Sequence, residues 1–202
     1  MHLQFRWLIT ISGLLLLLVA GIFVWQLTSA HTFSGVVNSP AQPAPDLTLT
    51  DDRGNAFELS ELRGRWVLLA YGYTHCPDVC PLTLGNLRSA KQLMGAASGK
   101  VAVVFVTVDP ERDTVSALHD YLSHFGPDFV GLTGSPAEIA VAAKAYNVRY
   151  SKVETGSSSG YAMAHSAYVY LIDPQGQWRL TYAFGVKPEE FAADLNYLAR
   201  EP

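Results

Sequence analysis

Two nearly continuous apolar runs, residues 66–73 and 101–108, constrain the fold of this chain more than any other feature. Each run has the length of a strand, and the lack of polar alternation is typical of a strand buried on both faces of a sheet. A segment with leucines at helical spacing, residues 81–94, lies between them. This order predicts an α/β fold built on a buried sheet.

The remaining elements extend the same pattern. Apolar alternation, turn residues and capping signals predict two further hairpins and three further helices. The hairpins are expected at residues 47–49 with 57–59 and at 167–172 with 178–182, and the helices at 114–125, 135–146 and 188–199. The whole order predicts a thioredoxin-like fold, with a central mixed sheet and helices on both of its faces.

The amino-terminal segment is the longest uncharged stretch. At about 1.5 Å per residue, a helix over residues 8–27 would cover the roughly 30 Å apolar core of a bilayer. Arg6 precedes this stretch and no Lys or Arg follows before Arg53, so the positive-inside rule leaves residues 1–7 in the cytoplasm. A cleaved signal peptide ending at residues 28–30 is the alternative, although its apolar core is normally shorter. Both interpretations export the domain, and a bacterial periplasm fits best.

Composition narrows the functional classes for the exported part. Residues 28–45, which contain Pro40, Pro43 and Pro45, are expected to form a linker ahead of a domain over 46–202. Hydrophobic residues make up 49% of the chain and charged residues 16%, which supports a buried core and argues against disorder. A formal net charge of −4 without a run of Lys or Arg argues against nucleic-acid binding.

The two cysteines, Cys76 and Cys80, lie where the first buried run ends and the first helix begins. Backbone N–H groups at a helix start favour the thiolate form. Residues four apart can face the same way, so both sulfur atoms can converge on one point. A structural disulfide is the plain alternative in an oxidising compartment, but it would close a very short loop and contribute little stability. We therefore favour metal or redox chemistry.

Three blocks of the sequence resemble a known family. Residues 71–81 are similar to the Cys-x-x-x-Cys-Pro signature of the SCO/SenC family, thioredoxin-like copper proteins that assemble cytochrome c oxidase. Residues 106–114 and 161–176 resemble two further blocks of that family. The similarity covers roughly residues 42–200, in order, together with the single anchor.

The resemblance implies that Cys76, Cys80 and His165 bind copper. Two thiolates and an imidazole suit Cu(I), whereas structural zinc normally takes four protein ligands; either Cu(I) or Cu(II) is compatible with the resemblance. Ala164 departs from the family, which usually has an acidic residue before the histidine, and this predicts weaker or differently tuned binding. Residues 152–160, rich in Gly and Ser, are expected to be a flexible loop that lets the histidine swing.

Several residues near these three have two alternative expected roles. Asp78 is expected either to influence proton or partner chemistry or to form a turn or cap, and Asp109 either to lie near the site or to start a helix. Met163 is either a transient soft ligand or a packing residue, and packing is favoured. His75 is expected to shape the turn rather than to bind metal. The residues expected to be solvated or to pack only are His119, His124, Tyr71, Tyr73 and Tyr161.

The primary functional hypothesis is a copper metallochaperone that passes its metal to the copper-receiving subunit of cytochrome c oxidase, and not an enzyme. Another periplasmic copper chaperone or a thiol reductant would be a further partner. The alternative is a thiol–disulfide oxidoreductase that reduces the cysteines of the oxidase copper site, with Cys76 and Cys80 as the redox pair. The three-residue spacer and the presence of His165 argue against reduction as the sole role. Copper sensing or protection without delivery is a third option.

Overall fold

The computed structural model describes residues 15–22, 31–156 and 160–200, and the chain divides into two units, Met1–Thr32 and Phe33–Pro202. In the first unit residues 15–22 are helical; the rest of the predicted anchor over 8–27 lies outside the described residues. Within the described ranges, no helix is both long and apolar enough to cross a membrane.

In the described part of the second unit, eight strands form a mixed sheet in the order β1-β10-β9-β4-β5-β6-β2-β3. Its three central strands, β4, β5 and β6, run parallel to one another, and all other pairs are antiparallel. The strands are β1 (Val36–Pro43), β2 (Thr48–Asp51), β3 (Ala56–Glu58), β4 (Trp66–Gly72), β5 (Val101–Thr107), β6 (Phe129–Thr133), β9 (Val169–Ile172) and β10 (Gln177–Tyr182).

Every residue of β4 and β5 is buried, as their unbroken apolar runs predict. The two predicted hairpins are also confirmed, as β2–β3 and β9–β10. The helices are α2 (Val79–Met94), α3 (Val115–Ser123), α4 (Pro136–Ala145) and α5 (Pro188–Leu198), with short 3-10 helices η1 (Leu59–Leu62) and η2 (Gly95–Lys100). Thr114 caps α3 and Ser135 caps α4 through their side chains, because each hydroxyl accepts a backbone N–H that the helix leaves unpaired.

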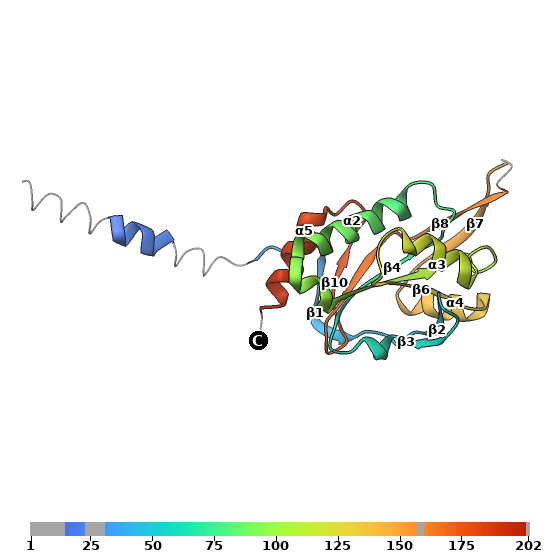
Figure 1. The fold of residues 1–202 in the computed structure, drawn as a ribbon, viewed down its shortest axis with the longest axis horizontal. Helices are drawn as coiled ribbons and strands as arrows, with labels where there is room; N and C mark the ends of the chain where they lie inside the picture. The colour runs from blue at the N-terminus through green and yellow to red at the C-terminus, as the bar shows by residue number, and fades with distance from the viewer. Residues whose placement is uncertain (1–14, 23–30, 157–159, 201–202) are drawn as a thin grey trace, which may run out of the picture. The chain divides into compact units, whose positions relative to one another are not determined.

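Two consecutive residues of β4 show how the helices are layered. Successive strand residues point to opposite faces of a sheet. The Tyr71 hydroxyl donates a hydrogen bond to the Ala142 carbonyl of α4, whereas Gly72 faces Cys80 of α2. Helices α2 and α4 therefore cover opposite faces, and α5 lies beside α2 (Figure 1). This arrangement confirms the expected thioredoxin-like fold for the part of the chain that the structure describes.

A separate two-stranded sheet, β7 (Tyr150–Glu154) with β8 (Tyr161–His165), projects from the main sheet (Figure 1). The sequence prediction of a flexible loop over 152–160 is wrong for residues 152–154, which pair with β8. Residues 157–159 of that prediction lie outside the described residues. Cross-strand pairing outweighs the low strand propensity of this segment, because β8 supplies a complementary row of backbone hydrogen-bonding groups.

Strand β1 differs from the expected linker over 28–45. Val36 and Val37 pair with Thr181 and Leu180 of β10, and the pairing resumes after an irregularity at Gln42 and Pro43. The outer edge of β10 offers unpaired N–H and C=O groups that an extended segment can satisfy. Prolines do not prevent this pairing, because an edge strand leaves one side of its backbone unpaired.

Candidate metal centre

The two cysteines lie at the carboxyl end of β4, where the chain turns into α2. Cys80 occupies the first turn of α2 and is only 3% exposed, whereas Cys76 in the preceding turn is half-buried. The N–H of Cys76 donates to the carbonyl of Tyr73 at 3.2 Å, and the N–H of Cys80 donates to the sulfur of Cys76 at 3.4 Å. The helix start therefore fixes the position of both sulfur atoms.

Gly72 allows α2 to approach the sheet this closely. A Cβ at this position would stand 2.7 Å from the sulfur of Cys80 and 2.6 Å from the ring of Phe105. Both distances are well inside van der Waals contact, so any side chain would push Cys80 or Phe105 out of place. The glycine at the end of the buried strand is thus part of what positions the second sulfur.

His165, the last residue of β8, completes the group. Its Nε2 lies 3.6 Å from the sulfur of Cys80, although 85 residues separate the two. Its Nδ1 lies 3.0 Å from the backbone carbonyl of Ser166, which can only accept, so Nδ1 carries the proton. The lone pair of Nε2 therefore faces the two sulfurs, which is the tautomer that a metal needs at that nitrogen.

The three donor atoms can hold one metal ion. The sulfurs of Cys76 and Cys80 and a ring nitrogen of His165 all lie within 4.8 Å of one another. Among the described residues they are the one group of three or more His, Cys, Asp or Glu side chains placed in this way. A donor set of two sulfurs and one nitrogen fits a soft ion of low coordination number better than a structural zinc ion.

The environments of the two thiols drive their pKa values apart. A hydrogen bond from Cys80 lowers the pKa of Cys76, and the backbone N–H groups of Asp78 and Cys80 act in the same direction, against partial burial. The pKa of Cys80 is raised, because Cys80 donates this hydrogen bond to Cys76 and is buried. Cys76 is therefore the thiolate of the pair in the metal-free protein, and Cys80 is the thiol.

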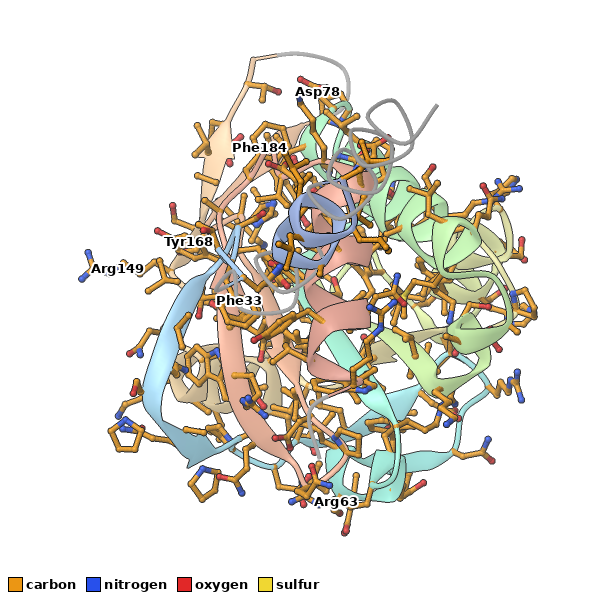
Figure 2. The ribbon with its side chains drawn as sticks, turned by 90° about the vertical axis from the view of Figure 1, so that its left-hand side faces the viewer. Phe33, Arg63, Asp78, Arg149, Tyr168 and Phe184 are labelled. Carbon is orange, nitrogen blue, oxygen red and sulfur yellow. The ribbon has the colours of Figure 1, made fainter. Side chains whose placement is uncertain are left out.

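The three residues expected near the site are distributed differently. Asp78 is exposed (Figure 2), and in the described part of the chain its carboxylate makes no capping hydrogen bond to α2. Its contribution to the site is its backbone N–H. Met163 is 7% exposed and lies two residues before His165 on the same face of β8. Asp109 is buried against Arg112 and Tyr161 and not against the sulfurs.

The expected roles of the other histidines need one correction. His75 is exposed, with Nδ1 3.0 Å from the Thr74 hydroxyl, and it lies outside the group of donor atoms. His119 is not simply solvated: its Nδ1 lies 3.0 Å from a carboxylate oxygen of the buried Asp52. The turn between β2 and β3 brings Asp52 to α3, a contact that helical spacing alone does not reveal.

Two side chains that shape the site were missed or underrated. Asp113 is fully buried and accepts hydrogen bonds from the backbone and hydroxyl of Thr74 and from the hydroxyl of Thr107. It thereby ties the turn before Cys76 to the end of β5. Tyr73, expected only to pack, meets the His165 ring edge-to-face at 5.9 Å. Asp113 lies inside the family-like segment 106–114, which was the available signal for it, whereas no local pattern indicates Tyr73.

Ala164 stands where an acidic residue was expected. It pairs with Ser151 of β7 and is exposed. Because neighbouring strand residues point to opposite faces, its side chain lies on the face of β8 away from His165. In this chain position 164 therefore does not contact the imidazole through its side chain.

The chain is similar to known proteins over most of its length. The SCO1/SenC family model matches residues 37–200. Over 153 residues the chain is 42% identical to the mitochondrial SCO2 homolog of Bos taurus, covering 75% of this chain and 58% of that protein. It is 34% identical over 152 residues to an SCO2-like protein of Rickettsia felis, covering 75% and 74% of the two chains. The chain thus spans less than two thirds of the cattle protein.

Solved structures show the same fold. The structure of Arabidopsis thaliana ScoI with copper bound superposes with a TM-score of 0.74 at 36% identity, over 79% of this chain and 99% of that one. The structure of Bradyrhizobium japonicum ScoI with copper bound gives a TM-score of 0.70 at 41% identity, over 77% and 99%.

Proposed function

The chain belongs to the SCO1/SenC family, and from this premise we propose that it binds copper through Cys76, Cys80 and His165 and supplies it to cytochrome c oxidase during assembly. Copper is in this view a cargo and not a resident catalyst. The recipient is the copper-receiving subunit of the oxidase. Two relatives whose structures contain copper support the choice of metal.

The observation that carries the proposal is the convergence of two sulfurs and the Nε2 lone pair of His165 within 4.8 Å. Thiolate and imidazole donors suit Cu(I), which accepts two or three ligands. Binding at neutral pH requires little prior deprotonation of Cys76, because its pKa is already lowered. Only the buried Cys80 must lose its proton when the metal enters.

The unequal exposure of the three ligands supports delivery. Cys80 is buried, whereas Cys76 and His165 are half-buried and can be reached from solvent. A thiolate or imidazole of an acceptor can therefore replace Cys76 and His165 as copper ligands before Cys80 dissociates from the metal. Transfer by stepwise ligand exchange needs no free copper ion at any point.

Binding is expected to depend on redox state. Oxidation by diamide takes two electrons from the pair, releases the one proton that Cys80 still carries and joins the sulfurs of Cys76 and Cys80, which leaves His165 as the sole strong donor of the three. The test is a competition between the full chain in detergent and a Cu(I) chelator under anaerobic conditions, with the dithiol and the diamide-oxidised form compared. We expect the disulfide form to bind Cu(I) far more weakly than the dithiol form. Equal affinities of the two forms would contradict the proposal.

We also place the domain on the outer side of a bacterial inner membrane, held by a single helix over residues 8–27. The uncharged length of that stretch and Arg6 before it support this placement. Protease added to intact spheroplasts would then cut the domain of the tethered chain. Full protection of residues 46–202 in spheroplasts, with cleavage only after lysis, would contradict the orientation.

Disulfide reduction of the oxidase copper site is the second candidate function. The lowered pKa of the accessible Cys76, beside a protonated Cys80, favours it, because attack on a disulfide needs a thiolate and resolution needs a second thiol. Such a reductase has no use for His165. Loss of oxidase assembly in His165→Ala with an unchanged dithiol potential would favour delivery, and full assembly would favour reduction.

A further inference from the structure

The β7–β8 hairpin lies outside the eight-stranded sheet, yet it carries one of the three metal ligands. In β7 four of the five residues are exposed. An exposed two-stranded hairpin is only marginally stable by itself. The position of His165 therefore depends on the contacts that hold this hairpin to the rest of the domain.

One cluster joins the hairpin to the carboxyl end of β5. The Tyr161 hydroxyl donates to Oδ1 of Asp109 at 2.8 Å, and Nε of Arg112 donates to Oδ2 of the same carboxylate at 2.5 Å. Nη1 of Arg112 donates to the backbone carbonyl of Tyr161 at 3.0 Å. The guanidinium also lies 3.8 Å from the centre of the Tyr161 ring. We call Asp109, Arg112 and Tyr161 the hairpin latch.

Burial separates the hairpin latch from an ordinary surface ion pair. The side chain of Asp109 is 1% exposed and that of Arg112 is 18% exposed, and the N–H of Asp109 is held by the Thr107 hydroxyl at 2.9 Å. Charged hydrogen bonds and cation–π contacts are stronger when water is excluded. The neighbouring ion pair between Lys152 and Glu111 is exposed on both sides and is expected to contribute little.

The hairpin latch reaches the metal centre by two routes. Along β8, Tyr161, Met163 and His165 share one face, because side chains alternate. Through space, the guanidinium of Arg112 lies 5.9 Å from the Tyr73 ring centre, and the Tyr73 ring in turn meets that of His165. A shift of Arg112 or Tyr161 is thus transmitted to the imidazole by the strand and by Tyr73.

We propose that Arg112 and Tyr161 are positioning residues that hold the β7–β8 hairpin closed and so keep the Nε2 atom of His165 over Cys80. This inference rests on the proposed function, because it concerns the residues that determine how tightly that same site binds copper. When the latch opens, the cysteine pair stays in place and only the histidine is withdrawn. The latch therefore sets how firmly the cargo is held and how readily the first ligand is released.

Nη2 of Arg112 is buried and has no hydrogen-bond partner among the described residues. An unsatisfied buried donor raises the free energy of the closed arrangement. Exposure of this nitrogen to water on opening recovers part of that cost. The unsatisfied donor therefore offsets part of the stabilisation that the hydrogen bonds of the latch provide. A closed state of moderate stability suits a site that must also release its metal.

The test measures Cu(I) affinity of the full chain by chelator competition for Arg112→Gln, Tyr161→Ala and Tyr161→Phe, each in the wild-type and in the His165→Ala background. Loss of a group that orients a metal ligand commonly weakens binding by about 10- to 100-fold. We expect about tenfold weakening for Arg112→Gln and Tyr161→Ala, and less for Tyr161→Phe, which keeps the ring. In the His165→Ala background the same changes should have no further effect.

Tyr146→Phe is the matched control, because it removes a tyrosine hydroxyl that donates to the Pro45 carbonyl at 2.7 Å and belongs neither to β7–β8 nor to the hairpin latch. Its copper affinity should be unchanged. Equal weakening by Arg112→Gln with and without His165 would overturn the inference, and so would unchanged affinity in all latch variants.

Amide hydrogen exchange of the metal-free chain tests the hairpin latch without copper. Arg112→Gln should speed exchange in β8 and leave β4 unchanged, whereas Tyr146→Phe should leave β8 unchanged. A wild-type chain that retains no copper would overturn the proposed function and not the latch, which the exchange rates then decide. Unaltered exchange in β8 of Arg112→Gln would overturn the latch itself.

Discussion

The central strands and the β7–β8 hairpin both position ligands of one site, but the central strands are buried and the hairpin is largely exposed. All seven residues of β4 are buried, and β4 pairs on both sides, with β5 and β9. Among the described residues, strand β7 pairs only with β8, and it is largely exposed. The core places Cys80 at the end of β4 through α2, whereas the hairpin places His165. A single donor set thus combines a ligand that the core fixes with one held by a few peripheral contacts.

This difference matters for a protein that must both hold and release a metal. Elements with few buried contacts open at a lower free-energy cost than the core of the same domain. A ligand on such an element can be withdrawn without unfolding the rest. The buried cysteine then acts as the retaining ligand and the histidine as the releasable one.

The largest expected effect is the contrast in stability between the two regions. Leu68 of β4 is fully buried, so Leu68→Ala should lower the free energy of unfolding by about 2–5 kcal/mol. Val153 of β7 is 46% exposed, and Val153→Ala should change it by less than about 0.5 kcal/mol. Urea denaturation measures both. Similar losses in the two variants would break the comparison.

The next effect links the core directly to the site. Gly72→Ala inserts a Cβ between the sulfur of Cys80 and the ring of Phe105, and overpacking of this kind costs about 1–3 kcal/mol. Copper affinity should fall with it, because Cys80 must move. Gly85→Ala, in the middle of α2 with open space around it, is the control and should gain about 0.5–1 kcal/mol. An unperturbed Gly72→Ala would show that the core does not fix Cys80.

A smaller effect concerns the chemistry of the two thiols. Because the pKa of Cys76 is lowered, its thiolate predominates at neutral pH. Its alkylation by iodoacetamide should stay nearly constant from pH 5 to 8, where an ordinary thiol of pKa about 8.5 changes roughly tenfold per unit. The sign for stability follows: the contribution of ionised Cys76 to the free energy of unfolding is fully present above the pKa of an unfolded thiol, about 8.5, and is lost progressively as pH falls from there through the lowered pKa of the folded chain.

Peptide mapping in the same reaction should find Cys80 unmodified in the folded chain, since it is buried and its pKa is raised. A rate at Cys76 that climbs steeply with pH would mean that the pair does not stabilise its thiolate.

The smallest effect is the response of the hairpin to its cargo. Copper bound through His165 adds a contact between β8 and the core, so amide exchange in β7 and β8 should slow on loading while β4, already buried, should not change. Mass-spectrometric exchange on apo and copper-loaded chain measures this. Equal slowing in His165→Ala would show that the protection does not come from the histidine.

Sequence patterns predict the core half of the molecule well. Both faces of β4 and β5 are covered, so nearly every residue in 66–73 and 101–108 is apolar. The sequence of each strand therefore indicates its burial directly. Helix α2 and the cysteines follow the same local rules. The carboxyl end of β4 is therefore the part of the site that the sequence indicates most directly.

The peripheral half could not be predicted in the same way. Strands β1 and β7 have little apolar alternation. Each forms because it pairs with a strand that lies elsewhere in the sequence: β1 pairs with β10 at Thr181, and β7 pairs with β8 at His165. The contact of Tyr161 with Asp109 spans 52 residues, and no spacing rule encodes it. The family resemblance signalled His165 itself, but not the residues that hold it in place.

Copper binding by the full reduced chain, compared with Cys76→Ala and His165→Ala, tests the central claim most directly. Competition with a Cu(I) chelator under anaerobic conditions gives affinity and stoichiometry. We expect one copper per wild-type chain, loss of tight binding without Cys76, and weaker but retained binding without His165. No retention by the wild-type chain, or an affinity that His165→Ala leaves unchanged, would contradict a site shared between the core and the hairpin.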